Sequence, residues 1–291
     1  MSTVLYDAPG PRAIARNRVL GILTVLVVAA GIGFLLWRLA ATGQFTAEKW
    51  AAFTYTQVWI DLALATGRTL GAFAVAALGA LALGFVLALG RLSEHAWLRV
   101  PAGIAVELLR AVPVLIFMFL LYYGLPVLGV RMSPYWAVVI ALIAYNGSVL
   151  AEVIRAGVQA LPRGQSEAGY AIGLRKAALM RLVLLPQAIR AMMPVIIAQL
   201  VVTLKDTALG FIITYPELLF YAKYLGTQST LDSPIIPATI VAGTVYIGLC
   251  LALSAVATAV ERRLRRTAPG VAPVRPPIQD MTDTALIAAQ R

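Results

Sequence analysis

The chain has 291 residues, of which 60% are hydrophobic and only 13% are charged, and its formal net charge is +11. An ordinary soluble domain contains roughly 25% charged residues, so this composition excludes one and indicates an all-α membrane protein with several spans. The positive charge is compatible with nucleic-acid binding or with loops retained in the cytoplasm, and its placement along the chain must decide between these.

Six apolar runs are each predicted to cross the membrane as a helix, and they cover residues 19–37, 69–89, 112–128, 135–153, 192–214 and 237–260. The first run follows a basic tail, residues 1–18. It is longer than the apolar region of about 7–15 residues in a secretory signal, so we expect an uncleaved anchor rather than a cleaved signal. Residues 41–68 are expected to form an outer segment, with Trp50, Tyr55 and Trp59 suited to the headgroup region.

Small residues recur at every fourth position of the second predicted span: Ala72, Ala76, Ala80, Gly84 and Ala88. Such a stripe allows two helix backbones to approach closely, which is how helices associate in lipid. The alternative is an apolar helix that is simply rich in alanine.

The Lys and Arg residues indicate the topology of the spans. Eighteen of the 24 fall in segments assigned to the cytoplasm, four fall in outer segments, and the other two are Arg38 at a boundary and Lys205 inside the fifth span. This bias predicts that both termini are cytoplasmic. It also accounts for most of the positive charge, so no nucleic-acid partner is expected.

Residues 154–191 form a basic, amphipathic interruption between the fourth and fifth spans. Ser166 is expected to cap a short helix, and Glu167 in its first turn would complement the helix dipole. The apolar face of that helix would consist of Ala168, Ala171, Ile172 and Leu174. A cytoplasmic helix without catalytic groups is suited to docking another protein; the alternative is a helix that lies on the lipid surface.

Polar residues inside the spans are candidates for contact with a transported solute. In the fifth span Gln199, Thr203, Asp206 and Gly210 fall within about 40° of one helical face, given 100° per residue. Lys205 and Asp206 are functional candidates because a charge at a helix centre costs about 2.5–3.5 kcal/mol on insertion scales. The alternative is that these charges pair with groups of a neighbouring subunit.

Asn146, in the fourth span, is a second polar candidate, and its alternative role is an interhelical hydrogen bond. Within the fifth span Lys205 and Asp206 are separated by about 100°, so one helical face presents both equally only if the helix is locally unwound. Thr207 follows them directly and adds a hydroxyl.

The basic loop resembles the cytoplasmic EAA loop of ABC-importer permeases. Glu167-Ala168-Gly169 is followed at the family's spacing by Gly173 and by Leu185-Pro186, with Gly169 and Val183 as the two departures in residue type. The second departure stands where the family has isoleucine. The resemblance identifies this stretch as a coupling helix, and it implies that Glu167, Ala168, Gly169, Gly173 and Pro186 belong to the contact with an ATPase subunit.

Further segments carry the resemblance over residues 66–266: Glu107 to Pro113, Ala151 to Gly157, and Lys205-Asp206-Thr207-Ala208-Leu209, which is similar to the K-D-T-S-L segment of polar-amino-acid permeases. Ala144 to Glu152 and the extra N-terminal span look most like actinobacterial glutamate-importer permeases. The resemblance implies a type I permease fold in the plasma membrane, and a substrate path for which we name Asn146, Gln199, Thr203, Lys205, Asp206 and Thr207.

By the same resemblance the expected domains are a cytoplasmic tail (1–18), an extra span with its outer segment (19–65), a permease core (66–266) and a disordered tail (267–291). The expected partners are ABC ATPase subunits, a second permease chain of the same or a related kind, an extracellular substrate-binding protein and the lipid bilayer. No lysine is followed by Ser or Thr as a phosphate loop requires, so the chain is not expected to be an enzyme. ATP and Mg²⁺ are expected in the ATPase subunit, and no cofactor in this chain.

Two other classes of protein are alternatives to the importer. An ATP-independent secondary amino-acid transporter would need no docking helix and would usually show inverted repeats, which this sequence does not display. A membrane-embedded enzyme would need His, Cys or paired carboxylates within its spans. The sequence contains one histidine, His95, and one cysteine, Cys250. A single residue of each type cannot form an internal disulfide or a His/Cys metal cluster.

Overall fold

The structure is a computed structural model that describes residues 10–266. Its described residues contain helices and no strands. The elements are α1 Pro11–Ala41, α2 Ala47–Ala51, η1 Ala52–Thr54, α3 Thr56–Arg91, α4 Ala96–Ala111, α5 Val114–Phe119, η2 Leu120–Gly124, η3 Leu125–Leu128, α6 Pro134–Gln159, α7 Arg163–Ala171, α8 Lys176–Leu179, η4 Met180–Leu184, α9 Leu185–Asp206, η5 Thr207–Ile213, α10 Leu218–Gly226, η6 Ser229–Leu231 and α11 Ile235–Arg266. The predicted disordered tail, residues 267–291, lies outside the described residues.

Five helices are long and apolar enough to cross a membrane: Pro11–Ala41, Thr56–Arg91, Pro134–Gln159, Lys176–Ile213 and Ile235–Arg262. They agree with the predicted first, second, fourth, fifth and sixth spans. Most are longer than predicted; α1, for example, begins at Pro11, inside the predicted N-terminal tail. Proline at the first position of a helix is pre-organised for the helical turn and loses no hydrogen bond there, which favours this early start.

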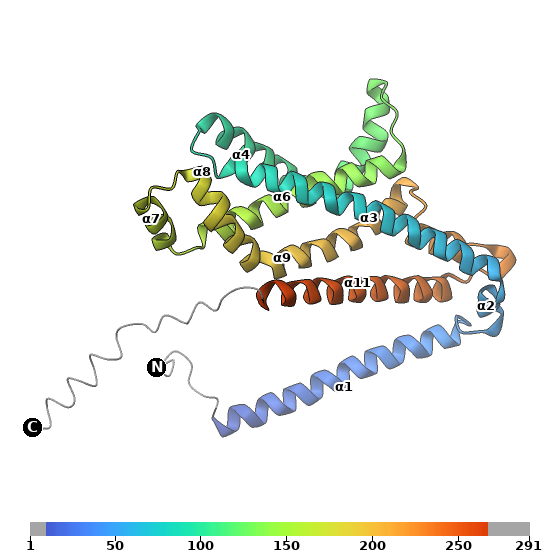
Figure 1. Ribbon diagram of the computed structural model, residues 1–291. Coiled ribbons are helices and arrows are strands. Elements are labelled where there is room, and N and C mark those ends of the chain that lie inside the picture. The colour runs from blue at the N-terminus through green and yellow to red at the C-terminus, as the bar shows by residue number, and fades with distance from the viewer. Residues whose placement is uncertain (1–9, 267–291) are drawn as a thin grey trace, which may run out of the picture.

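The third span differs from its prediction. Residues 112–128 do not form one straight helix; Ala96–Ala111 and Val114–Leu128 make a bent pair with an angle of 94° between them. Val112 is extended, with φ −89° and ψ 122°, directly before Pro113, because a residue before proline is disfavoured in the helical region. The predicted loop 90–111 is therefore largely the amphipathic helix α4, and the segment after it projects from the bundle (Figure 1).

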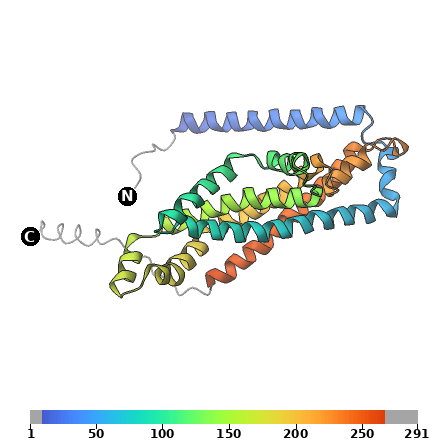
Figure 2. The ribbon, with the colours of Figure 1, turned by 90° about the horizontal axis from the view of Figure 1, so that it is seen from above.

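The core forms around α6, which lies along α3 between the other helices (Figures 1 and 2). All five members of the small-residue stripe of α3 are buried, and this confirms the predicted close helix packing. At Gly84 an added Cβ would lie 2.8 Å from the Leu150 Cβ and 2.9 Å from the Gly147 carbonyl oxygen, so only glycine permits this crossing of α3 and α6.

α3 has 36 residues, which gives it a length of about 54 Å at 1.5 Å per residue, far more than the roughly 30 Å of the bilayer core. α3 is thus too long to lie wholly within the bilayer core, and its first turns pack with η1 and α10 at the end of the bundle away from α7 (Figure 1). There the hydroxyl of Tyr215 donates to the carbonyl oxygen of Arg68 at 2.8 Å, and Lys49 pairs with Asp232 at 3.2 Å. The predicted outer segment 41–68 is thus mostly helical and packed.

A charge network joins α3, α4 and α6 at the other end of the bundle. Arg91 Nη1 lies 2.7 Å from Glu152 Oε2, and Arg155 also binds Glu152 through its Nε at 2.9 Å. Glu107 on α4 approaches Arg91 at 4.0 Å. The segments that carried the resemblance supply Glu107, Glu152 and Arg155. These residues therefore hold α3, α4 and α6 together next to α7, which follows α6 in the chain.

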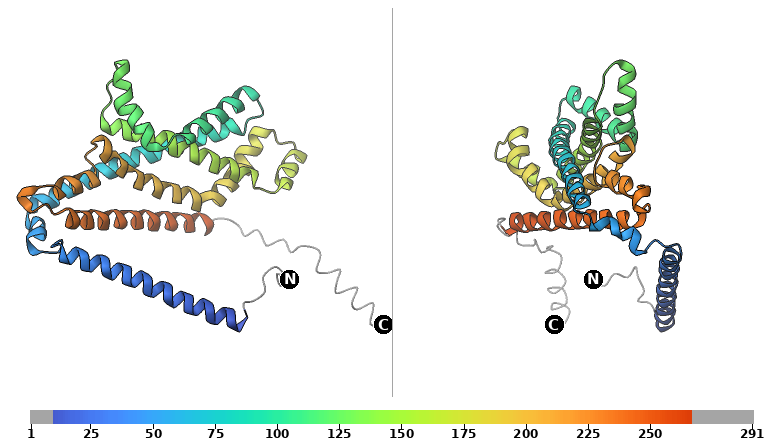
Figure 3. Two further views of the ribbon diagram at one scale, coloured as in Figure 1. Left: turned by 180° about the vertical axis from the view of Figure 1, so that it is seen from behind. Right: turned by 90° about the vertical axis from the view of Figure 1, so that its right-hand side faces the viewer.

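α1 stands apart from the rest of the described chain. None of its residues is buried, and the ribbon runs beside the bundle with a clear separation in all views (Figures 1, 2 and 3). The start of α1, the end of α11 and the helix α7 lie at the same end of the molecule (Figures 1 and 3).

Candidate functional site

α7 begins four residues earlier than predicted. Its first residue is Arg163, its N-cap is Pro162, and no side chain caps it. The predictions that Ser166 caps this helix and that Glu167 stands in its first turn are therefore wrong, because Ser166 lies inside the helix and Glu167 follows the first turn. The fixed φ of Pro162 starts the turn without a hydroxyl cap.

Gly173 ends α7 through backbone geometry that glycine favours. Its φ is +81°, its N–H donates to the Tyr170 carbonyl at 2.9 Å, and the N–H of Leu174 donates to the Gly169 carbonyl at 3.1 Å. This pair of bonds is a Schellman motif, and an L-residue in that conformation costs roughly 1–2 kcal/mol. The glycine of the loop pattern thus has a structural reason: it turns the chain sharply from α7 into α8.

Gly169, the first departure from the loop pattern, is buried against α8. An added Cβ would lie 2.5 Å from Leu179 Cδ1, and the Leu179 side chain is itself buried. Glycine at this position lets α7 sit closer to α8 than alanine would. The closer packing offsets the intrinsic helix cost of glycine, about 0.8–1.0 kcal/mol relative to alanine.

The opposite face of α7 is open to solvent. Glu167 and Ala168 are exposed, and Tyr170 and Ile172 expose 51% and 77% of their surface. Leu174 instead turns inward and packs on the hydrophobic cluster at this end of the bundle. The predicted apolar face is therefore largely available for contact with a partner, but without Leu174.

Pro186 lies near the start of α9 and is exposed. The turn before it, Met180–Leu184, is a π-helix. A proline inside a helix loses one hydrogen bond and crowds the preceding turn, and a widened turn relieves that crowding. Gln187, next to Pro186, donates through Nε2 to Gln165 Oε1 at 3.3 Å and links α9 to α7. Pro186 therefore marks where the exposed segment joins the membrane helix.

The structure brings Asn146 and Gln199 together. Gln199 Nε2 donates to Asn146 Oδ1 at 2.7 Å, and Asn146 Nδ2 donates to the Leu142 carbonyl at 3.1 Å. Asn146 is fully buried. The amide pair is thus the interhelical hydrogen bond between α6 and α9 that was the alternative role for Asn146.

The two threonines of the predicted path are also buried in the protein. The hydroxyl of Thr203 donates to the Gln199 carbonyl at 2.9 Å, and that of Thr207 donates to the Leu204 carbonyl at 2.6 Å. The predicted polar stripe of the fifth span therefore faces other helices and avoids lipid, as its insertion cost requires.

Lys205 points elsewhere. It is exposed and lines an open cavity of about 500 Å³ between α9 and α11, together with Ala208, Tyr246 and Cys250. The α-helix ends at Asp206, and the chain continues as a 3₁₀-helix, Thr207–Ile213. The change from α-helix to 3₁₀-helix directly follows Lys205 and Asp206, the two charges that one regular helical face could not present equally. Lys205 and the amide pair nevertheless lie on different sides of α9.

A buried polar group that the sequence analysis missed is Glu217. Its carboxylate accepts from the N–H groups of Leu219 and Phe220, both at 2.8 Å, and from the hydroxyl of Tyr246 at 2.6 Å. Glu217 is fully buried, and this burial raises the pKa of its carboxyl. It caps α10 and ties that helix to α11, and the acidic residue directly before an apolar run was the signal that could have found it.

Comparison with known proteins decides the family. Residues 80–266 match the family described as binding-protein-dependent transport system inner membrane component. The chain belongs to this family. Its matched region contains α6 to α11, and therefore both the exposed α7 and the polar residues of α9. The chain is thus a membrane permease.

Among the relatives of this permease is the glutamate transport system permease protein GluD of Corynebacterium glutamicum, which is 38% identical over 78% of this chain and 84% of its own length. The probable glutamine ABC transporter permease protein GlnP of Bacillus subtilis is 32% identical over 55% of this chain and 74% of its own. The crystal structure of an amino acid ABC transporter with histidines has a TM-score of 0.67 at 28% identity, and the match covers 75% of this chain and 100% of that one.

Proposed function

We propose that this permease is the transmembrane subunit of an ATP-driven importer of glutamate or another polar amino acid. The observation that carries the proposal is the exposed face of α7, with Glu167 and Ala168 on it, at the end of a bundle whose helices enclose polar side chains. The names of the relatives GluD and GlnP support the class of substrate.

In the proposed assembly, two permease chains, identical or related, each present one α7 to an ATPase subunit, and ATP with Mg²⁺ binds in that subunit. Movement of the ATPase subunits shifts α7. The short α7–α8 turn and the Arg91–Glu152 bridge pass the movement on to α9, α3 and α6. An extracellular binding protein delivers the amino acid to the outer ends of the helices. Both termini and α7 are then cytoplasmic, as the charge distribution predicts.

The experiment that tests the function is an uptake assay in cells that express the permease with its ATPase and binding protein. We expect labelled glutamate to accumulate, unlabelled glutamate to compete more strongly than glutamine, arginine or histidine, and depletion of ATP to stop uptake. Uptake by the permease alone, insensitive to ATP depletion, would contradict this function and favour the secondary transporter.

Lys205 is proposed as the group that meets the substrate carboxylate, because it lines the open cavity beside α11. Lys205→Gln is expected to lower the maximal uptake rate about tenfold, the size of one lost charge-assisted hydrogen bond. The half-saturating concentration should stay the same, since the binding protein sets it. Arg190→Gln, which removes an exposed charge from the same helix, serves as the control. Equal rates for the two variants would remove Lys205 from the path.

A further inference from the structure

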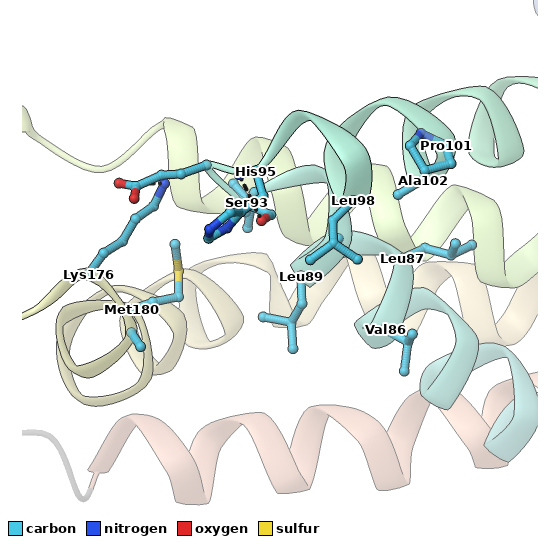
Figure 4. Close-up of a pocket in the computed structure, with 14 residues that line it drawn as sticks. Val86, Leu87, Leu89, Ser93, His95, Leu98, Pro101, Ala102, Lys176 and Met180 are labelled. Atoms are coloured by element: carbon cyan, nitrogen blue, oxygen red, sulfur yellow. Dashed lines mark hydrogen bonds and ion pairs between the residues drawn. The ribbon is translucent and has the colours of Figure 1, made fainter.

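A second cavity, of about 700 Å³, lies at the end of the bundle that carries α7. It is formed where α3 ends, where α4 begins and where α8 passes beside them (Figure 4). None of the predicted docking or path residues lines it. Its walls are mostly apolar and include Val86, Leu87, Leu89, Leu98 and Met180.

The walls of this cavity suit a hydrocarbon chain better than water. The cavity is open, and covering its apolar walls with an acyl chain is favourable by roughly 25 cal/mol for each Å² of apolar surface removed from water. Val86 exposes 63% of its surface and Leu98 39%, so the apolar lining continues onto the outer surface of the bundle. In a membrane protein, that surface is in contact with acyl chains.

The position of the cavity corresponds to the headgroup region of one leaflet. It lies at the end of the long apolar run of α3, which stops at Arg91. Trp97, at the start of α4, exposes 72% of its surface, and exposed tryptophan is typical of the membrane interface. A phospholipid in this leaflet can therefore place its chain in the cavity and its head group at the rim.

The rim carries one cation beside one anion. Lys176 Nζ lies 3.1 Å from Glu94 Oε1, with the Lys176 side chain 35% and the Glu94 side chain 64% exposed. His95 and Ser93 lie beside this pair (Figure 4). An exposed ion pair contributes little on its own, so both groups can exchange partners at small cost.

We propose that this cavity binds a phospholipid with an ethanolamine head group, with one acyl chain between α3, α4 and α8. The phosphate lies on Lys176 and the ammonium group on Glu94. The adjacent positive and negative side chains complement the adjacent negative and positive charges of that head group. An anionic head group would meet Lys176 equally well but would be repelled by Glu94, and a choline head group has no N–H to donate to it.

Native mass spectrometry of the purified permease with equimolar phosphatidylethanolamine and phosphatidylglycerol tests the proposal. We expect phosphatidylethanolamine to be retained about fivefold more than phosphatidylglycerol, a preference of the size of one exposed ion pair. Lys176→Gln should lower the retained phosphatidylethanolamine by about the same factor. The matched control is Arg181→Gln, which removes an exposed charge one turn along the chain, outside the cavity, and should change nothing.

Two further variants separate the head group from the chain. Glu94→Gln should abolish the preference for phosphatidylethanolamine over phosphatidylglycerol while lipid is still retained. Ala177→Phe, which puts a ring into the cavity from an exposed position, should lower retention of both lipids alike. Equal losses in Lys176→Gln and Arg181→Gln, a wild-type preference for phosphatidylglycerol, or unchanged retention in Ala177→Phe would each overturn the proposal.

Discussion

Glu167→Lys is expected to reduce amino-acid uptake to the background level while the permease stays in the membrane at its normal abundance. Glu167 is exposed on α7 and has no role in holding the bundle together, so the fold should tolerate the change. In the proposed docked complex, however, the new lysine would place a positive charge where the interface now has a carboxylate. A misplaced charge at an interface typically costs several kcal/mol.

The measurements are uptake of labelled glutamate, the amount of permease in the membrane, and ATP hydrolysis by the assembled complex. Glu48→Lys makes the same charge change on α2, at the opposite end of the molecule (Figure 1), and should leave the ATPase subunit bound to the permease. Uptake at the wild-type rate by the Glu167→Lys permease would show that α7 does not couple to an ATPase.

Replacing either member of the buried amide pair is expected to destabilise the permease. Asn146→Leu leaves the Gln199 amide without its partner at 2.7 Å, and Gln199→Leu does the same to Asn146. A buried polar group without a partner costs about 1–3 kcal/mol, although hydrogen bonds between membrane helices average about 0.6 kcal/mol in the best-studied case. Thermal unfolding of the permease in detergent measures the loss in each single variant.

The double variant, with leucine at both positions, separates packing from transport. Because neither side chain is then polar, we expect it to be more stable than the sum of the two single losses predicts. If Asn146 and Gln199 also line the path, the double variant will be stable but slow in uptake. Strictly additive losses would mean that the bond between the two amides contributes nothing.

The spans were predictable because apolar length decides them. The small-residue stripe of α3 was equally readable, since a four-residue spacing places its members on one face of any helix. The bend in the third span was not predictable, because hydropathy carries no information about the direction in which a helix runs. Pro113 was visible, but the 94° bend depends on how α5 packs around Met118 and Leu142 while Val106 of α4 packs in a separate cluster.

The candidate site was readable in part for the same reason. The polar stripe and the glycine that ends α7 follow from local spacing and backbone preference. The pairing of Gln199 with Asn146, and the position of Lys205 on another side of α9, depend on the rotation of packed helices. The bonds from Glu217 to the start of α10 are local, but its bond to Tyr246 could not be derived, because the two residues lie 29 positions apart in sequence.

The separation of α1 from the bundle has a consequence for how this permease tolerates sequence change. A side chain of α3 or α6 must match the shape of its neighbours, and one extra methyl group at Gly84 would collide with α6. No residue of α1 is buried in the described protein, so no other element of the described chain constrains the shapes of its side chains. The sequence of α1 is therefore constrained by its hydrophobicity and its length, and not by side-chain packing against the bundle. Shuffling its apolar residues should leave anchoring unchanged, whereas the same shuffling in α3 would remove the interface on which transport depends.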